Sequence, residues 1–239
     1  MYDEFKDLAA YYDELYVKSD QYQREVVQID RFVSTYKQNE GNKLLDIACG
    51  TGGHLTYLQD RYQVAGLDLS QDMLLIARKK FPTIPFYLEN MINFSLDQHF
   101  DIIICMYGSI GFVKTFVNLK QTMNTIVNHL NPGGIIIIVP WSTTETFQER
   151  IVTDVVNLPH IRIARMENVK QKTTNLVEVT IHHLIDQNRQ VKHHTQTVEV
   201  GLFSQKEYTS AFQEAKIQLV EFYQGREISM SAFVGRLPK

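Results

Sequence analysis

The chain has 239 residues, of which 44% are hydrophobic and 11% aromatic, enough for one domain with a sizeable core or one domain with an elaborate insertion. The formal net charge of −3 and the lack of a basic stripe argue against a nucleic-acid partner. Two cysteines, Cys49 and Cys105, are too few for a disulfide framework, which favours a cytoplasmic location. The acidic start is unlike a signal peptide, and the longest aliphatic run, 135–139, is too short to span a bilayer, so no membrane partner is expected.

The first 140 residues alternate between helical spacing and uninterrupted apolar runs. Apolar residues at every third or fourth position predict helices at 22–36, 54–61, 71–80 and 116–130. Short apolar runs predict buried strands at 43–48, 64–67, 86–88, 100–106 and 135–139. Strands without polar alternation, interleaved with helices, are typical of a parallel sheet covered on both faces. We therefore expect an α/β protein with a doubly wound, mostly parallel sheet.

The pattern changes after residue 142. Segments rich in Val, Ile and Thr predict strands at 162–170, 176–185 and 191–200, the last two joined by a hairpin turn. A helix at 205–215 and strands at 218–223 and 231–237 are expected to close the chain. We therefore expect a core of residues 1–142 and 202–239 that is interrupted by an antiparallel β insertion, residues 143–201. The insertion is expected over the carboxyl ends of the parallel strands, where open α/β sheets bind ligands.

A glycine-rich turn, DIACGTG at residues 46–52, follows the first predicted strand. Gly50 and Gly52 allow backbone amides to approach a ligand closely, and the start of the next helix presents unpaired N–H groups. Asp68 ends the second strand, where a carboxylate can accept hydrogen bonds from both hydroxyls of a ribose. A turn that merely joins a strand to a helix would not require this carboxylate.

Nicotinamide enzymes share this geometry, but their motif has a third glycine where this chain has Leu55. Asp46 also precedes the glycines, where it would repel a pyrophosphate. S-adenosylmethionine has no phosphate and carries an ammonium group that Asp46 can hold, directly or through water. The sequence therefore favours S-adenosylmethionine as cofactor. A nicotinamide-dependent oxidoreductase and a non-catalytic nucleotide-binding module are the alternatives.

Three segments resemble the class I S-adenosylmethionine-dependent methyltransferases: LLDIACGTG at 44–52, GLDLSQDML at 66–74 and LNPGG at 130–134. More specifically, the chain is similar, nearly end to end, to the N,N-dimethyltransferases that act on nucleotide-linked amino sugars. Looser similarities lie at residues 12–13, 140–141 and 202–203. The resemblance implies a Rossmann-like fold and methylation of a small molecule.

The resemblance and the chemistry of the residues together indicate a cofactor pocket. Its expected members are Tyr12, Asp46, Ala48, Gly50, Gly52, Asp68, Met73, Asn90, Met91 and Met106. Asp68 is expected to bind the ribose, and the methionines to form soft apolar walls, although methionine also fills protein cores. Tyr12 offers a ring face or a hydroxyl near the cation. Asn90 stands where the resembled family has aspartate, and its amide oxygen can still accept a hydrogen bond from the adenine amino group.

The candidates for an acceptor pocket are Tyr2, Tyr22, Trp141, His182 and His194. The histidine pairs at 182–183 and 193–194 flank the predicted hairpin, which would place one histidine of each pair on each face. A proton acceptor over the pocket and a solvated sheet face are both compatible with this pattern. Two imidazoles on each face are too few for zinc, so no metal site is expected.

Three positions depart from the resembled family. Met230 stands at the position of an arginine, Val139 at that of a glutamate before Pro-Trp, and Phe112 where one type of member has a histidine. All three differences concern the expected acceptor pocket.

The expected reaction is in-line transfer of a methyl group from S-adenosylmethionine to a small-molecule acceptor. An amine, for instance that of an amino sugar, needs only to arrive unprotonated, whereas a hydroxyl needs a base, and the sequence offers no assured one. N-methylation is therefore favoured over O-methylation, with the insertion shaping the acceptor pocket. The number of methyl groups added and the oligomeric state stay open, a homodimer included.

Overall fold

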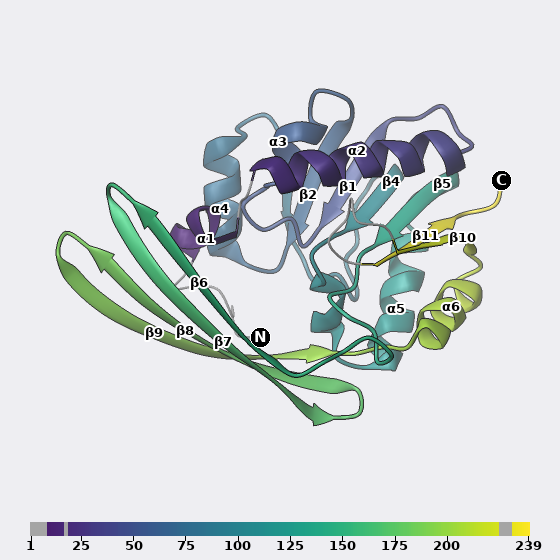
Figure 1. Ribbon diagram of the computed structural model, residues 1–239. Coiled ribbons are helices and arrows are strands. Elements are labelled where there is room, and N and C mark those ends of the chain that lie inside the picture. Colours follow the sequence, from purple (N-terminus) through teal and green to yellow (C-terminus); the bar gives the residue numbers. More distant parts are fainter. Residues whose placement is uncertain (1–8, 17–18, 225–230) are drawn as a thin grey trace.

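A computed structural model describes residues 9–16, 19–224 and 231–239 of the chain (Figure 1). These residues form one sheet of seven strands and one of four. The strands of the larger sheet are β1 (Lys43–Ile47), β2 (Gln63–Asp68), β3 (Phe86–Leu88), β4 (Phe100–Cys105), β5 (Leu130–Ile138), β10 (Gln218–Tyr223) and β11 (Ala232–Arg236). They lie in the order β10-β11-β5-β4-β1-β2-β3. The pairs among β1 to β5 are parallel, and β10 and β11 add an antiparallel edge beside β5.

Helices cover both faces of this sheet, as Figure 1 shows for α2 on one side and α5 and α6 on the other. The helices are α2 (Ser19–Tyr36), α3 (Leu55–Leu58), α4 (Gln71–Lys80), α5 (Phe116–Val127) and α6 (Gln205–Glu214). Consecutive residues of β4 enter opposite cores, because side chains alternate across a strand. Ile102 and Ile104 pack with α2, α3 and α4, whereas Ile103 and Cys105 pack with α5 and α6. The expected doubly wound, mostly parallel α/β fold is confirmed.

The smaller sheet is fully antiparallel, in the order β6-β7-β8-β9. Its strands are β6 (Arg150–Leu158), β7 (Ile161–Thr173), β8 (Leu176–Gln187) and β9 (Gln190–Gly201). The carboxyl end of β9 packs on a 3-10 helix, η2 (Ser109–Val113), which follows β4. Contact is so close that a Cβ at Gly111 would lie 2.4 Å from Cγ1 of Val200. The smaller sheet is therefore attached at the carboxyl ends of the parallel strands.

A short helical segment, η1 (Ala9–Tyr11) and α1 (Tyr12–Tyr16), lies between the two sheets (Figure 1). Leu15 packs with Ile163 and Ile185 of the smaller sheet. Asp13 hydrogen-bonds the Thr51 hydroxyl of the glycine-rich turn and forms an ion pair with Lys80 of α4. This segment therefore contacts both sheets.

Strand β6 was not predicted from the sequence, for a reason visible in its two faces. Ile151 and Val155 are exposed on the outer face, whereas Asp154 lies on the inner face and pairs with Arg165. Val152 and Val156 also lie on the inner face, so apolar residues occur on both faces of β6 and the alternation of an ordinary half-buried strand is absent. Helix α3 is also shorter than the expected 54–61, because turn structure occupies residue 54 at its start and residues 59–61 at its end. No helix in the described ranges is both long and apolar enough to cross a membrane.

Candidate active site

The turn after β1 is built from residues with positive φ. Ala48, Gly50 and Gly52 have φ of 58°, 54° and 83°. A side chain at Gly52 would collide with the ring of Phe81, because its Cβ would lie 2.8 Å from Cε2. This tight path brings the Gly50 N–H to Asp68 Oδ2 at 2.7 Å. The carboxylate that ends β2 is thereby fixed beside the turn.

A cavity of about 970 Å³ opens in front of this turn. Asp68 lies in its wall, and Asp68 Oδ1 accepts a further hydrogen bond from the Ser70 N–H at 2.8 Å. A carboxylate has about four lone-pair sites, so it can still accept bonds from ligand hydroxyls. The cofactor candidates in the wall are Tyr12, Ala48, Gly50, Asp68, Met73, Asn90 and Met91.

Three cofactor candidates do not line this cavity. Gly52 shapes the turn from behind, and Met106 is buried in the core beneath α2. Asp46 is 2% exposed, and its Oδ2 has no hydrogen-bond partner. Burial raises the pKa of this carboxyl to about 7. A buried carboxyl near the end of β1 with one unpartnered oxygen suits a cationic ligand group such as the ammonium of S-adenosylmethionine.

Two tyrosines lie together in the middle of the cavity wall. Tyr22 of α2 and Tyr107, which follows β4, have ring centroids 5.3 Å apart. His54 stands behind them at 4.6 Å from Tyr22 and 5.3 Å from Tyr107, and its Nε2 is 2.9 Å from Glu25 Oε2. Burial, together with neighbouring acidic groups, raises the pKa of both tyrosines. Their hydroxyls therefore stay protonated, and their rings pack against His54 of a buried histidine–glutamate pair.

The inner face of β7 adds a charged group to the wall. Arg165 and Glu167 both line the cavity, with Arg165 Nη1 3.0 Å from Glu167 Oε1. Arg165 also pairs with Asp154 of β6 and lies over the ring of Tyr16, 4.8 Å from its centroid. Its positive charge is therefore compensated by two carboxylates, and this part of the wall is polar without a large net charge.

The hairpin histidines occupy both faces of the smaller sheet, as the spacing predicted. His183 pairs in register with His194, and His182 Nδ1 contacts His193 Nε2 at 3.1 Å on the outer face. His183 is fully buried, and neither of its ring nitrogens has a hydrogen-bond partner. Burial and the charge of Arg165 lower the pKa of His183 to about 4, so it is neutral.

Neither of the acceptor candidates His182 and His194 lines the cavity. His182 lies on the outer face, and His194 lies nearer the β8–β9 turn than Val198, which does line it. Of the other acceptor candidates, Tyr22 and Trp141 are in the wall. Tyr2, like Met230, lies outside the described residues. Across the ranges that the structure describes, no three His, Cys, Asp or Glu side chains group closely enough to hold a metal ion.

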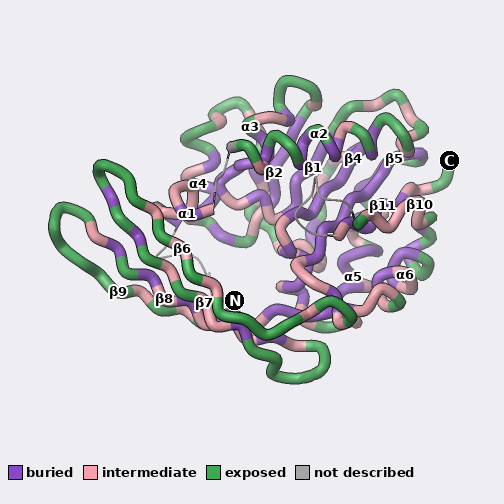
Figure 2. Tube along the Cα trace, in the orientation of Figure 1, coloured by how far each residue is buried: buried purple, intermediate pink, exposed green. Residues whose placement is uncertain are grey.

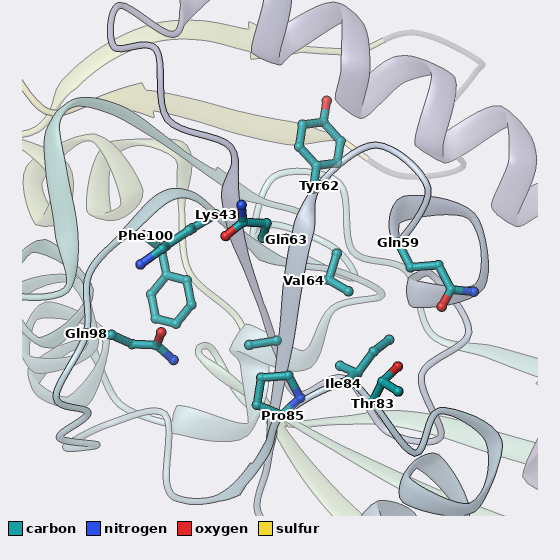
Figure 3. Close-up of a pocket in the computed structure, with 11 residues that line it drawn as sticks. Lys43, Gln59, Tyr62, Gln63, Val64, Thr83, Ile84, Pro85, Gln98 and Phe100 are labelled. Atoms are coloured by element: carbon teal, nitrogen blue, oxygen red, sulfur yellow. The ribbon is translucent and has the colours of Figure 1, made fainter.

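A second, smaller cavity of about 370 Å³ lies at the amino-terminal ends of the parallel strands (Figure 3). Lys43 and Gln63, which begin β1 and β2, are in its wall together with Tyr62. The strands run from these amino-terminal ends toward Asp46 and Asp68, so the second cavity is remote from the glycine-rich turn. None of the candidates for cofactor or acceptor lines it.

Comparison with known proteins matches residues 44–134 to a methyltransferase domain family. Over 96% of its length the chain is 33% identical to the dTDP-3-amino-3,4,6-trideoxy-alpha-D-glucopyranose N,N-dimethyltransferase of Streptomyces venezuelae, of which 97% is covered. The chain belongs to this family of methyltransferases. A second relative, the dTDP-3-amino-3,6-dideoxy-alpha-D-glucopyranose N,N-dimethyltransferase of Streptomyces fradiae, is 30% identical over 96% of the chain and 90% of its own length.

Solved structures agree with this assignment. The crystal structure of Streptomyces venezuelae DesVI superposes on the methyltransferase with a TM-score of 0.88 and 32% identity, covering 97% of this chain and 98% of the other. The S-adenosylmethionine-bound amino pentose methyltransferase CalS10 of Micromonospora echinaspora gives a TM-score of 0.82 and 25% identity, covering 98% and 97%. The methyltransferase thus transfers a methyl group from S-adenosylmethionine to a small-molecule acceptor.

Several residues of the site were missed by reasoning from the sequence. Glu25 carries a signal in retrospect, because it falls one helical turn after Tyr22, on the face of α2 that also buries Val26 and Ile29. Arg165 and Glu167 alternate with exposed positions along β7, which places them on the same face as the buried Ile163. Tyr107 gave no signal, because its contact with Tyr22 depends on how α2 packs against the end of β4.

Proposed function

We propose that the methyltransferase methylates the amino group of a nucleotide-linked amino sugar, and that it does so twice. The observation that carries the proposal is that one continuous cavity of about 970 Å³ extends from Gly50 and Asp68 to the inner face of the smaller sheet. Three relatives that are 30–33% identical over most of the chain are named as N,N-dimethyltransferases of dTDP-linked amino sugars. The smaller sheet is proposed to shape the acceptor end of the cavity.

The cofactor end is proposed to hold S-adenosylmethionine, whose sulfonium supplies an electrophilic methyl group. Asp68 accepts hydrogen bonds from the ribose hydroxyls, and Asp46 faces the ammonium group, directly or through water. Met73 and Met91 contribute polarizable contacts to the adenine, and Asn90 can accept from its amino group. Tyr12 covers the turn, since a Cβ at Gly50 would lie 3.9 Å from its Cε1.

The acceptor amine is proposed to lie beside Tyr22 and Tyr107. Both hydroxyls are protonated and can accept a hydrogen bond from an amine N–H, which orients the nitrogen lone pair toward the methyl group. Holding two reactants in line can supply about 7–11 kcal/mol of the barrier reduction. The buried Glu25–His54 pair keeps the two tyrosine rings in place, which makes these two residues positioning residues.

The described cavity wall favours an amine over a hydroxyl acceptor. No histidine among the described residues lines it, and the carboxylate of Glu167 is neutralised by Arg165. A hydroxyl would need a base near neutral pKa, whereas an amine requires only its own deprotonation. O-methylation is therefore the second candidate and not the first.

The test is to incubate the protein with S-adenosylmethionine and a dTDP-linked amino sugar, with the corresponding hydroxy sugar as matched control. Mass spectrometry should show one and then two added methyl groups on the amino sugar, and NMR should place both on nitrogen. The rate should rise with pH as the amine itself deprotonates. Methylation on oxygen, or equal turnover of the hydroxy sugar, would contradict the proposal.

A further inference from the structure

The acceptor end of the cavity contains three cations that differ in how their charge is compensated. Arg165 is paired with two carboxylates, Glu167 and Asp154. Lys114 has Glu199 at 3.8 Å. Arg150 lines the cavity and forms no ion pair with any carboxylate among the residues that the structure describes. Arg150 is therefore the cation with charge left to offer a ligand.

Arg150 is held against an aromatic surface. Its guanidinium carbon lies 4.5 Å from the ring centroid of Trp141, and Nη1 donates a long hydrogen bond, 3.4 Å, to the Gln148 carbonyl of its own chain segment. A guanidinium on an indole uses its face for the ring and keeps its remaining N–H groups directed outward at the edges. Such an edge matches the oxygens of a phosphate, which arginine binds in bidentate fashion.

Trp141 is itself fixed in position. It follows β5, and a Cβ at Gly108, whose φ is 76°, would lie 2.4 Å from Cβ of Trp141. The indole also packs with Phe147, at a centroid distance of 6.3 Å, and against the apolar inner face of the smaller sheet. The platform under Arg150 is therefore formed without a ligand, which reduces the ordering cost of binding.

The platform also lies on the acceptor side of the reaction centre. Gly108 directly follows Tyr107, and the Gly108 N–H donates to the Val139 carbonyl at 2.8 Å, so Tyr107 and Trp141 lie on adjacent strand ends. An acceptor whose amine meets Tyr107 would thus extend toward Arg150 with its other end.

We propose that Arg150, supported by Trp141, binds a phosphate group of the acceptor and so makes the enzyme select phosphate-bearing sugars. This inference rests on the proposed function, which it deepens by assigning a residue to the charged part of the substrate. Lys114 contributes less, because Glu199, which also pairs with Lys172, already compensates its charge.

The first test measures binding without turnover. The probe is dTDP, titrated by calorimetry into the full chain saturated with S-adenosylhomocysteine. The dissociation constant should rise about 10–100-fold in Arg150→Gln, the range expected for losing a charged hydrogen bond. Arg162→Gln is the matched control, because Arg162 belongs to the same sheet but is exposed on its outer face, and it should change the constant less than about twofold. Added salt should weaken binding to the wild type more than to Arg150→Gln.

The second test compares two acceptors, a dTDP-linked amino sugar and the methyl glycoside of the same amino sugar, which carries no phosphate. In Arg150→Gln the ratio of kcat/KM for the nucleotide-linked sugar to that for the glycoside should fall by about 10–100-fold. Trp141→Leu should lower the same ratio by a smaller factor.

Three outcomes would overturn the inference. These are no binding of dTDP to the wild type, equal binding to the wild type and Arg150→Gln, or an equal loss of kcat/KM for both acceptors. Failure of the proposed function is distinguishable, because it would appear as no methylated nitrogen on either sugar. The calorimetric result for Arg150 would still stand in that case.

Discussion

The two sheets of the methyltransferase differ in where they carry polar residues. In the parallel sheet the strand interiors are mostly apolar and buried, and every residue of β4 is buried (Figure 2). The polar residues lie mostly at strand ends, where Asp46 and Asp68 stand at or next to the carboxyl ends of β1 and β2. In the antiparallel sheet, polar residues such as Arg165 and His183 lie within the strands, on the inner face. The proposed donor site is thus built by backbone geometry at strand ends, and the proposed acceptor site by side chains along a surface.

This difference separates two chemical tasks. The turn after β1 can bind only a ligand that fits its fixed amides and its two acids. The inner face of the smaller sheet can change its ligand by exchanging single side chains, because the strand hydrogen bonds do not depend on them. Substitutions in the two regions should therefore give separable effects on donor and acceptor.

The largest effect is expected from Asp46→Asn, which tests whether ionisation of the buried Asp46 carboxyl lowers the stability of the folded protein. The pKa of Asp46 is raised from 3.8 to about 7 in the folded chain, so the folded state binds more protons than the unfolded state between these values. The contribution of protonated Asp46 to the free energy of unfolding is fully present below pH 3.8 and is lost as pH rises through about 7. Three pKa units correspond to at most about 4 kcal/mol.

Thermal unfolding of the cofactor-free protein at pH 5 and pH 8 measures this effect. The wild type should lose more stability between the two pH values than Asp46→Asn does. Cofactor binding to the wild type near pH 7 should release protons, because a bound ammonium favours the ionised acid, and the variant should not release them. Equal pH dependence in both proteins would show that Asp46 titrates normally.

The next effect is expected from Asp68→Ala, which should act on the donor alone. The dissociation constant for S-adenosylmethionine, measured by calorimetry, should rise about 10–100-fold, because the variant lacks the carboxylate that accepts hydrogen bonds from the ribose. Asp60→Ala, in the exposed loop after α3, is the control and should leave binding within about twofold. An unchanged constant in Asp68→Ala would remove Asp68 from the cofactor site.

Arg165→Ala should act on the acceptor alone, and so sharpens the comparison from the other side. It leaves Glu167 and Asp154 without their cation in the cavity wall. The KM for the acceptor should rise by about tenfold, the order expected when partly buried charged groups lose their partner, while cofactor binding should change less than twofold. Arg162→Ala controls for removing an arginine from the same strand. A comparable loss of cofactor affinity would break the proposed separation of the two sheets.

The smallest effect is expected at the junction, where Tyr22→Phe removes one hydroxyl and keeps the ring contacts with Tyr107 and His54. Loss of an acid–base group lowers kcat by roughly 10²–10⁴-fold. If orientation dominates catalysis, Tyr22→Phe should lower kcat by less than about 10²-fold. The pH profile, measured with and without the substitution, should keep the same apparent pKa. A kcat loss larger than that range would identify Tyr22 as a proton-transfer group.

The sequence predicted the geometry of the proposed donor region well, because its signals are local. Gly50 and Gly52 mark backbone conformations, and Asp68 follows an apolar run, so the positions could be derived without knowing the rest of the fold. Two elements of this half differ from the prediction: α3 loses residue 54 and residues 59–61 to turns, and β5 begins at Leu130, before the expected residue 135.

The acceptor region was predicted poorly, because its residues are defined by register. The histidine spacing correctly placed one member of each pair on each face, yet which histidine became buried depended on the pairing of His183 with His194. Arg150 lies in a strand that the apolar pattern did not predict. Its contact with Trp141 joins the first residue of β6 to the segment that follows β5. Such contacts require the three-dimensional arrangement and leave no periodic trace.

One feature at the base of the smaller sheet bears on how such enzymes diversify. A β-bridge joins Thr143 to Phe203, so the chain leaves the parallel core and returns to it at neighbouring points. The segment between Thr143 and Phe203 is therefore an insertion whose two ends lie side by side at the core. Exchanging this insertion between related enzymes would require only that the two junctions match. The part of the proposed acceptor site that lies on the smaller sheet can then change while Tyr22, Tyr107 and Trp141 of the core stay in place.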